Sequence, residues 1–328
     1  MTTDPSSPQP TWPPGARPVA CVDLGGTKLA VCLADDTGLH ARVTESTATQ
    51  GDNLAVARQI IRLVDQSCAV AGLTRADLGG VGVAACGPFV FNQGQAELAP
   101  PNLCGGLAGA ARGLPNDWTR IPLQAPLQAA FGAPVRVEND AIAALVAERR
   151  WGALQGVDHC AYVTWSTGIG LGLCVDGHVL RGKNGNAGHA GHTFVSDHLE
   201  GLCGCGNIGD VEGLVAGNAI ARRFASLGYT DAAMLFEAAH AGDTRAGALL
   251  DDVCRVMGRT LYNLVVTLDL QRIAIGGSVF WHHRERLLPR LQAALDARLP
   301  ALTAGVDIVA AGLGPQVGDW AACALATG

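Results

Sequence analysis

The sequence predicts a mixed α/β protein built from two βββαβα lobes around a cleft. The first reason is a repeated pattern: a meander of short apolar runs, with a glycine-rich turn between its first two strands, occurs at residues 18–46 and again at 159–181. The second reason is that helical periodicity and further apolar strands follow each meander. The third is the length of 328 residues, which is long for one hydrophobic core and suits two.

The first lobe should contain a three-stranded meander, a helix, two further strands and a second helix. Its strands are expected at Pro18–Asp23, Leu29–Ala34, Leu39–Ser46, Gly80–Ala84 and Val135–Glu138. The apolar face of its first helix is expected to hold Leu54, Ala57, Ile61, Val64 and Cys68. The second helix runs through Arg150 and is opened by Asn139 or Asp140, two residue types that favour helix starts.

The second lobe repeats this order. Its strands are expected at His159–Trp165, Leu173–Val175, His178–Arg181, Arg272–Ile275 and Val306–Ala310. A glycine-rich turn over residues 166–172 separates the first two of these strands, and helices dominate from Val211 to about Leu268. A last helix is expected at Gln316–Ala326.

The domain organisation follows from these elements. Residues 1–17 are rich in Pro, Ser and Thr without periodicity, so we expect a disordered leader. Residues 18–137 should form a smaller N-terminal lobe, completed by the C-terminal helix within 315–328. Residues 138–314 should form the larger lobe, including a loop at 188–212.

Composition excludes several classes of protein. A net charge of −6 argues against nucleic-acid binding, and no apolar run is long enough to span a bilayer, so we expect neither partner. The eleven cysteines are mostly single residues within apolar runs, for example Cys21, Cys32, Cys160 and Cys174. This odd count, without a signal peptide, indicates reduced thiols in a cytoplasmic protein and not a disulfide framework.

The two glycine-rich turns suggest phosphate binding. Backbone N–H groups at such turns can cradle phosphate oxygens, because glycine lets the backbone approach closely. Each turn taken singly is better explained by a tight hairpin. Two turns at matching places, one of them carrying Asp23, Thr27 and Lys28, favour phosphate binding.

The segment 188–212 suggests a metal site. It contains Gly-His-Ala-Gly-His at 188–192, and then Cys203 and Cys205 within a glycine-rich run that ends at Glu212. Thiolate and imidazole ligands suit zinc, and four ligands close a tetrahedral structural site. Such a site would also hold a glutamate and a second histidine in place to read hydroxyl groups by hydrogen bonds.

Five segments in this order resemble the motifs of the ROK family (repressors, open reading frames, kinases), within the actin-like ATPase and hexokinase fold. The resemblance covers nearly everything after the leader. It matches Asp23-Leu-Gly-Gly-Thr-Lys28 to the first phosphate motif, Glu138-Asn-Asp140-Ala-Ile-Ala-Ala144 to the catalytic motif, Ser166–Gly170 to the second phosphate motif, Gly276-Gly277-Ser278 to the adenosine motif, and Gly188–Glu212 to the zinc and sugar signature. The resemblance implies a sugar kinase that uses ATP and Mg²⁺.

Two details narrow the substrate that the resemblance implies. Most glucokinases of the family carry Glu where this chain has His189, and the Ala-Gly-His-x-Gly-His form is similar to bacterial N-acetylmannosamine kinases. The run Pro101–Gly106 is similar to that group as well. The resemblance therefore implies transfer of the γ-phosphoryl group to the 6-hydroxyl of N-acetylmannosamine.

The resemblance also implies roles for individual residues. Asp140 would be the catalytic base, although a helix cap is its alternative role. Asp23 would order a water on Mg²⁺, or simply form a strand-end turn. The phosphates and adenosine would be bound by Gly25, Gly26, Thr27, Lys28, Thr167, Gly168, Gly276 and Gly277. For Lys28, a solvated lysine after a turn is the alternative.

Sugar and zinc contacts are implied in the same way. The sugar would meet Gly87, Asn102, Asn139, Asp140, His189, His192 and Glu212. A satisfied loop histidine is the alternative for His189, and helix capping for Glu212. Zinc would be held by His192, Cys203, Cys205 and Asp210, with His198 as a spare ligand. Because the family usually has a third cysteine at position 210, the alternatives are a weaker site or a lost one.

Other functions remain open at this point. A glucokinase, or a kinase for another hexose or for N-acetylglucosamine, is the nearest rival, and His189 is the residue that separates them. A sugar-responsive repressor of the family would need a DNA-reading helix-turn-helix, and the Pro-rich residues before Asp23 do not predict one. A sugar-binding protein without activity is the third possibility. The resemblance further implies a homodimer.

Overall fold

The computed structural model describes residue 12 and residues 15–107, 113–198 and 201–328. Most of the leader predicted over residues 1–17 lies outside these ranges. The chain divides into two compact units. Unit 1 comprises Met1–Gly152, Arg181–Ala187 and Gln316–Gly328, and unit 2 comprises Ala153–Leu180 and Gly188–Pro315.

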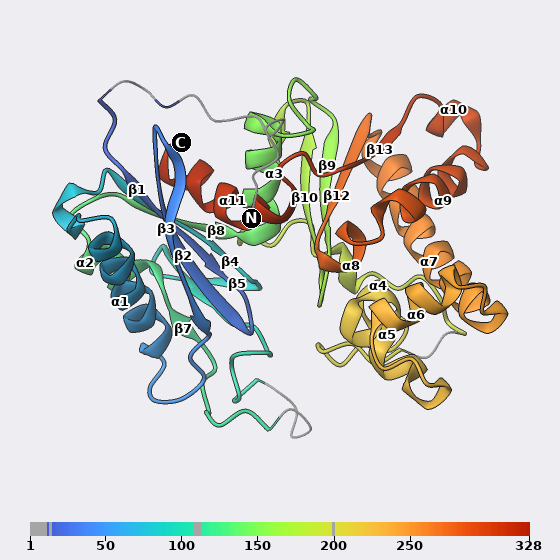
Figure 1. The fold of residues 1–328 in the computed structure, drawn as a ribbon, viewed down its shortest axis with the longest axis horizontal. Coiled ribbons are helices and arrows are strands. Elements are labelled where there is room, and N and C mark those ends of the chain that lie inside the picture. Colours follow the sequence, from blue (N-terminus) through green and yellow to red (C-terminus); the bar gives the residue numbers. More distant parts are fainter. Residues whose placement is uncertain (1–11, 13–14, 108–112, 199–200) are drawn as a thin grey trace. The chain divides into compact units, whose positions relative to one another are not determined.

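Unit 1 is built on a five-stranded sheet with the order β3-β2-β1-β4-β8 (Figure 1). Its strands are β1 (Val19–Leu24), β2 (Lys28–Asp35), β3 (Gly38–Ser46), β4 (Gly80–Ala85) and β8 (Val135–Asn139). The first three form the predicted antiparallel meander, and β4 and β8 run parallel to β1. Because these parallel strands end at one edge of the sheet, residues at their carboxyl ends come together there.

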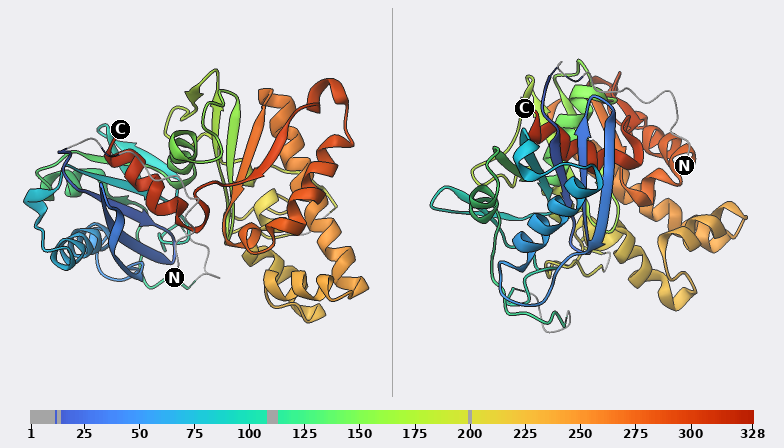
Figure 2. Two further views of the ribbon diagram at one scale, coloured as in Figure 1. Left: turned by 45° about the horizontal axis from the view of Figure 1, so that its top comes forward. Right: turned by 60° about the vertical axis from the view of Figure 1, so that its left-hand side comes forward.

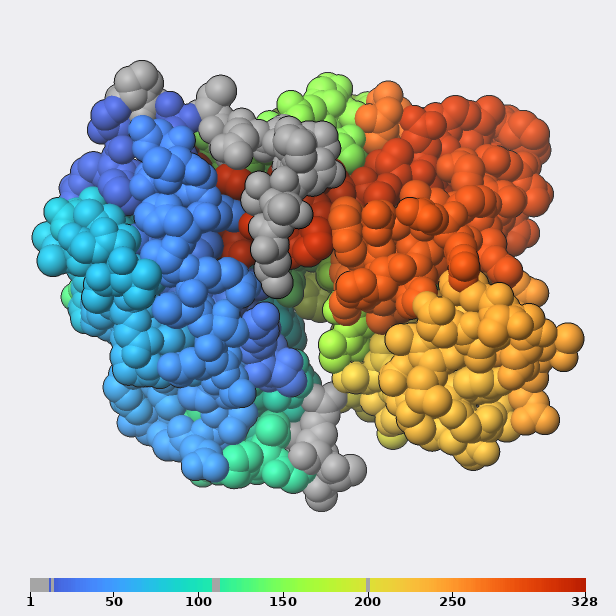
Figure 3. All heavy atoms as spheres, viewed as in Figure 1, coloured from blue at the N-terminus to red at the C-terminus, as the bar shows by residue number. Residues whose placement is uncertain are grey.

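Two sets of helices pack on this sheet. The helices of unit 1 are α1 (Ala55–Val70), α2 (Gln124–Ala130), α3 (Asp140–Trp151) and α11 (Val317–Ala326). Helix α1 packs on β2 and β3, and this part of unit 1 is blue in Figure 3. The C-terminal helix α11 packs on β1, β4 and α3, shown in red against the blue strands in Figure 2. A side chain at Gly82 would overlap the carbonyl oxygen of Ala322, so glycine at this position lets α11 approach the sheet.

A second, three-stranded sheet in unit 1 was not predicted. It consists of β5 (Phe89–Asn92), β6 (Gln95–Leu98) and β7 (Ile121–Pro122). The side-chain amide of Asn186 accepts a hydrogen bond from the Phe89 N–H and donates one to the Phe89 carbonyl, both at 2.7 Å. This pairing attaches the segment 181–187 to unit 1.

Unit 2 repeats the sheet of unit 1, with the order β11-β10-β9-β12-β13. Its strands are β9 (Cys160–Trp165), β10 (Ile169–Val175), β11 (His178–Val179), β12 (Arg272–Gly276) and β13 (Asp307–Ala310). Again the first three are antiparallel and the last two run parallel to the first. Each sheet therefore holds five strands. A βββαβα pattern contains only four strands, so each unit has one more parallel strand than that pattern.

The helices of unit 2 cover its sheet and enclose one apolar core. They are α4 (Val211–Val215), α5 (Gly217–Phe224), α6 (Ala232–His240), α7 (Thr244–Leu268), α8 (Ser278–Trp281), α9 (Arg284–Asp296) and α10 (Pro300–Thr303). The predicted helical region from Val211 to about Leu268 is confirmed. Within the described part of the chain, no helix is both long enough and apolar enough to cross a bilayer.

Several predicted elements need correction. Three residues of the predicted face of α1, Ala57, Val64 and Cys68, are buried as expected. Leu54 instead precedes the helix and is 37% exposed, and the packed face also includes the fully buried Ile60 and Leu63. The predicted turn over residues 166–172 is shorter, because β10 already begins at Ile169. The strand predicted at His178–Arg181 ends at Val179, since the chain then leaves unit 2 for unit 1.

The division into units differs from the predicted domain boundary between residues 137 and 138. Residues 138–152 group with unit 1, because α3 packs on α11 and β8 pairs with β4. Residues 316–328 also group with unit 1. These units describe only how the chain packs. The predicted division into two separate domains stays a prediction.

Candidate active site

Carboxylates gather at the carboxyl edge of the unit 1 sheet. Asp23 lies near the end of β1, and Asp140 is the first residue of α3, directly after β8. Asp319 lies in the first turn of α11. The pKa of Asp23 is raised to about 7. Burial is the main cause, and the negative charges of Asp319 and Asp140 add to the shift. The sheet thus brings together two residues that the sequence predicted for the site and a third that it did not.

Asp140 is held at the start of α3 with its carboxylate only partly solvated. Burial raises its pKa to about 6, although the N–H of Ala141, which donates to Oδ1 at 2.8 Å, opposes the shift. The helix cap is Asn139, whose Oδ1 accepts hydrogen bonds from Ala141 N at 3.0 Å and Ile142 N at 3.2 Å. The capping role that the sequence left open for Asp140 therefore belongs to Asn139, which is buried.

The turn between β1 and β2 is fixed by its own backbone. Gly25 N donates to Lys28 O at 2.9 Å, and the Thr47 hydroxyl donates to Gly25 O at 2.8 Å. Thr27 and Lys28 are exposed at this turn. A side chain at Gly26 would overlap the amide of Asn102, so the structure places this predicted sugar contact beside the predicted phosphate turn.

An ion pair behind Asp23 was missed by the sequence reasoning. Arg42 Nε donates to Asp319 Oδ2 at 2.9 Å, linking β3 to α11. The other carboxylate oxygen of Asp319 is buried and has no hydrogen-bond partner among the described residues. A Cβ at Gly318 would lie 2.6 Å from Asp23 Oδ2, so α11 lies directly against Asp23. No sequence signal could have paired Arg42 with Asp319, because they are 277 residues apart.

Replacing Arg42 with Met should lower the free energy of unfolding by about 1–3 kcal/mol, because the Asp319 carboxylate, only 6% exposed, would lose its charged partner. Asp319→Asn should recover part of this loss in the double variant, since it removes the unpaired charge. Urea unfolding of the two single variants and the double variant gives the coupling energy. If the loss of stability in the double variant equals the sum of the two single losses, the ion pair contributes no coupling energy.

Gly87, a predicted sugar contact, and Glu138, in the predicted catalytic motif, also lie in unit 1. Gly87 follows β4 and precedes Pro88 through a cis peptide bond. Glu138, within the predicted catalytic motif, accepts a hydrogen bond from Arg181 Nε at 2.5 Å and is 13% exposed. Arg181 lies in the segment that returns to unit 1, so this ion pair connects the catalytic motif with a chain segment that the sequence did not assign to it.

Unit 2 brings the second phosphate motif and the adenosine motif together. Ser166 Oγ and Ser278 Oγ lie 2.9 Å apart, and Gly217 N donates to Ser166 O at 2.8 Å. Gly277 has a φ of +89°, and a side chain there would overlap the backbone of Trp165, so the position requires glycine. The predicted residues Thr167, Gly168, Gly276 and Gly277 therefore share the carboxyl end of β9 and β12.

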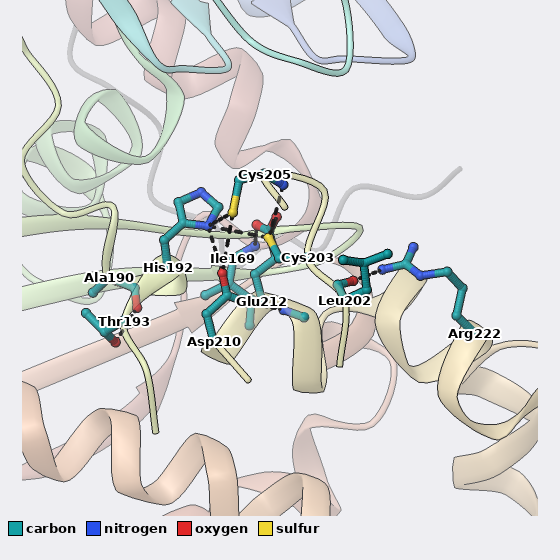
Figure 4. Close-up of polar contacts among 11 residues, drawn as sticks. Ile169, Ala190, His192, Thr193, Leu202, Cys203, Cys205, Asp210, Glu212 and Arg222 are labelled. Carbon is teal, nitrogen blue, oxygen red and sulfur yellow. Dashed lines mark hydrogen bonds and ion pairs between the residues drawn. The ribbon is translucent and has the colours of Figure 1, made fainter. Parts of the chain in front are cut away.

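His192, Cys203, Cys205 and Asp210 form one compact cluster in unit 2, with their side chains pointing toward one another (Figure 4). His192 Nδ1 lies 3.5 Å from each of the two sulfur atoms and 3.3 Å from Asp210 Oδ2. Cys205 Sγ lies 3.6 Å from the same oxygen. Zinc bonds of about 2.0–2.3 Å in a tetrahedron separate ligand atoms by about 3.5 Å, so the cluster has the spacing of a zinc site.

The cluster is held by its surroundings. Asp210 is fully buried, and its Oδ1 accepts from Gly213 N at 2.7 Å as the cap of α4, which leaves Oδ2 for the cluster. Burial raises the pKa of Cys203 well above that of a free thiol, and the charges of Glu212 and Asp210 add to the shift. A bound cation would favour the charged thiolate and so lower this pKa again. Among the described residues, His198 is outside the cluster.

The remaining sugar-side residues lie next to this cluster. The His189 and His192 rings stack with centroids 6.2 Å apart. Side chains at Gly188 and Gly191 would overlap the carbonyls of Leu171 and Ile169, so both glycines let this histidine segment lie on β10. Glu212 Oε2 accepts from Ile169 N at 2.9 Å, and its Oε1 lies 3.4 Å from Cys203 Sγ. Glu212 therefore ties the metal cluster to the start of β10, beside Gly168.

The predicted residues fall into two sets, one in each unit. Unit 1 holds Asp23, Gly25, Gly26, Thr27, Lys28, Gly87, Asn102, Asn139 and Asp140. Unit 2 holds Thr167, Gly168, His189, His192, Cys203, Cys205, Asp210, Glu212, Gly276 and Gly277. A surface hollow in unit 2 contains none of them; it is lined by Phe194, Val195, Ser196, Asp197, Arg259, Tyr262, Asn263 and Arg298.

Comparisons with known proteins agree with this fold. The ROK family matches residues 19–328. The chain is 32% identical over 260 residues to the N-acetylmannosamine kinase of Salmonella typhimurium (strain LT2), covering 79% of this chain and 82% of that protein. The ROK hexokinase from Thermus thermophilus superposes with a TM-score of 0.74 and 31% identity, covering 94% and 98% of the two chains. The ROK family glucokinase from Streptomyces griseus, in complex with glucose and AMPPNP, gives 0.70 and 26%, covering 94% and 99%.

These relatives define a class, the sugar kinases with the actin-like ATPase fold. The chain belongs to the ROK family. The predicted family and the predicted fold class are both confirmed.

Proposed function

We propose that this protein is an ATP-dependent sugar kinase that transfers the γ-phosphoryl group to the 6-hydroxyl of N-acetylmannosamine. The observation that carries the proposal is the position of Asp140, a partly buried carboxylate at the carboxyl edge of the unit 1 sheet, beside Asp23. The sequence identity to an N-acetylmannosamine kinase supports the choice of sugar, and the sugar kinases among the relatives support the reaction.

Phosphoryl transfer needs alignment, neutralisation of charge and an acceptor for the proton of the attacking hydroxyl. With a pKa of about 6, Asp140 is mostly ionised at neutral pH and accepts this proton. When bound, Mg²⁺ supplies positive charge to the phosphates. Asp23 would orient a water of that ion, and the turn at 25–28 would offer backbone N–H groups and Lys28 to phosphate oxygens.

Unit 2 would contribute the remaining contacts. Thr167 and Gly168 bind phosphate oxygens, and Gly276 and Gly277 pack against adenosine, since the structure joins their two turns through Ser166 and Ser278. His189, His192 and Glu212 bind the sugar, together with Gly87, Asn102 and Asn139 of unit 1. The hydrogen bond from Ile169 N and the contact with Cys203 Sγ would hold the Glu212 carboxylate in one orientation.

His189 should decide the choice of sugar. A histidine can donate as well as accept a hydrogen bond, whereas an ionised glutamate only accepts. We expect N-acetylmannosamine to give the highest kcat/KM in a coupled ADP-release assay that also includes N-acetylglucosamine, mannose and glucose. His189→Glu should shift relative kcat/KM toward glucose, and His198→Glu, which changes a histidine outside the cluster, is the matched control.

The outcomes separate the rival functions. Preference of the wild-type protein for glucose would identify a glucokinase and contradict the proposed sugar, but not the kinase. Sugar binding by calorimetry without ADP release would identify a sugar-binding regulator and contradict the kinase. Mass spectrometry and NMR of the product would establish whether oxygen 6 carries the phosphate.

The metal cluster and the oligomer belong to the same proposal. His192, Cys203, Cys205 and Asp210 would bind one structural zinc ion, as their spacing supports. The homodimer is inferred from the family resemblance, and light scattering after size exclusion tests it. A monomer at all protein concentrations would contradict that part alone.

A further inference from the structure

A second cluster of metal-ligating side chains lies elsewhere in unit 2. Glu237 and His240 are three residues apart on α6, so they lie on the same face of the helix. His283 lies between α8 and α9. One ligand atom from each of the three side chains lies within 4.8 Å of the others. None of these residues takes part in the cluster around His192 or in the proposed reaction.

Packing holds His283 on the buried side of this cluster. The His283 ring meets Phe236 edge-on, with centroids 4.8 Å apart and an interplanar angle of 77°. His283 Nδ1 lies 3.8 Å from Glu237 Oε1, and the His240 and His283 ring centroids are 5.9 Å apart. The His283 side chain is only 8% exposed, whereas Glu237 is 71% exposed. The cluster therefore has a rigid buried side and one carboxylate that solvent can reach.

Packing alone leaves one ring atom of His240 unexplained. His240 Nδ1 is buried and has no hydrogen-bond partner among the described residues. A buried polar atom without a partner costs about 1–3 kcal/mol, so such atoms are uncommon in folded proteins. Aromatic packing accounts for the position of His283 against Phe236, but it gives His240 Nδ1 no partner. Coordination of a cation by this nitrogen would remove the cost.

We propose that Glu237, His240 and His283 form a second divalent metal site that binds zinc. Two imidazoles and one carboxylate are ligands that zinc takes in proteins, and a Glu-x-x-His spacing on one helix is a recurring way to present two of them. Three protein ligands leave the fourth tetrahedral position to water.

The position of the site gives it a structural consequence. His283 follows α8, which begins at Ser278 directly after the Gly276-Gly277 turn. Zinc would join α6 to the segment that carries this turn, in addition to the contact of His283 with Phe236. Bound zinc should therefore stabilise unit 2 even in protein whose first cluster cannot bind metal.

The test measures zinc stoichiometry on the full-length protein. After chelation and dialysis against buffered Zn²⁺, elemental analysis should give one more zinc per chain in the wild type than in His240→Ala. Glu237→Gln alters an exposed side chain and should weaken the second binding event roughly ten-fold or more without affecting folding. His282→Ala is the matched control, because His282 is the exposed neighbour of His283 and lies outside the cluster.

A Cys203→Ser background separates this site from the first cluster. There, Zn²⁺ should still raise the melting temperature, and Glu237→Gln should reduce that rise. Equal zinc content in the wild type, His240→Ala and Glu237→Gln would overturn the proposal. An equal loss of zinc in His282→Ala would also overturn it, because the binding would then be general to surface histidines.

Discussion

Asp140→Asn should lower kcat by about 10²–10⁴-fold while leaving the fold and sugar binding intact, because the amide cannot accept the proton of the attacking hydroxyl. The substitution is nearly isosteric, and an Asn side-chain oxygen can still accept from Ala141 N, which lies 2.8 Å from Asp140 Oδ1. Steady-state kinetics with ATP and N-acetylmannosamine measures kcat, and calorimetry measures sugar binding.

A variant for comparison is Asn139→Asp, next to Asp140 and itself a proposed sugar contact. It keeps a side-chain oxygen that can cap α3, where Asn139 accepts from Ala141 N and Ile142 N. It should raise KM for the sugar, because Asn139 is a proposed sugar contact, but it should lower kcat much less than Asp140→Asn, because it leaves the proposed base in place. A folded Asp140→Asn protein with near-normal kcat would remove Asp140 from the role of base.

The pKa of Asp140 also predicts how activity and stability depend on pH. Since only the carboxylate can accept a proton, kcat should fall as the pH is lowered through about 6, the pKa of Asp140. Folding raises this pKa from 3.8 to about 6, so the folded protein binds more protons than the unfolded chain between these two values. The contribution of Asp140 to stability therefore decreases as pH rises through this window. Asp140→Asn should raise the melting temperature at pH 8, and an unchanged or lower value would contradict the burial of an ionised carboxylate.

Cys203→Ser should release one zinc ion per chain and lower the melting temperature by roughly 5 °C or more, because the binding energy of a structural metal is folding energy. Cys203 is only 3% exposed, and its sulfur lies 3.5 Å from His192 Nδ1. Its loss therefore removes a ligand from the buried side of the cluster. Elemental analysis and thermal unfolding, on protein purified without chelator, measure the two effects.

Asp210 offers a pair of variants that separates its two contacts. Asp210→Asn keeps an oxygen that can cap α4 through Gly213 N but removes the anionic ligand, whereas Asp210→Ala removes both. Both should lose zinc affinity, and Ala should cost about 0.5–2 kcal/mol more stability than Asn through loss of the cap. Full zinc retention by Asp210→Ala would mean that the fourth ligand lies elsewhere. No zinc in the wild-type protein would contradict the metal site itself.

The local pattern of the sequence was sufficient for much of the fold. Both meanders, their glycine turns and the helical region after Val211 were predicted, because strand alternation, turn residues and helical periodicity act over a few residues. The small sheet of β5, β6 and β7 was missed, since its strands have only two to four residues and carry little periodicity. The packed face of α1 was predicted only in part, because several adjacent positions are apolar and only the sheet beneath selects Ile60 and Leu63.

The candidate site shows the same division between local and long-range information. The residues proposed to carry the chemistry follow from the sequence by itself, because Asp23, Asp140 and the proposed ligands from His192 to Asp210 lie in short motifs. Tertiary structure decided what surrounds them. The pairing of Arg42 with Asp319 across 277 residues, and the raised pKa of Asp23 that burial and neighbouring charges produce, depend on α11 packing on the unit 1 sheet. Contacts between segments far apart in the chain leave no periodic signal, and the pKa of a buried group depends on all the charges packed around it.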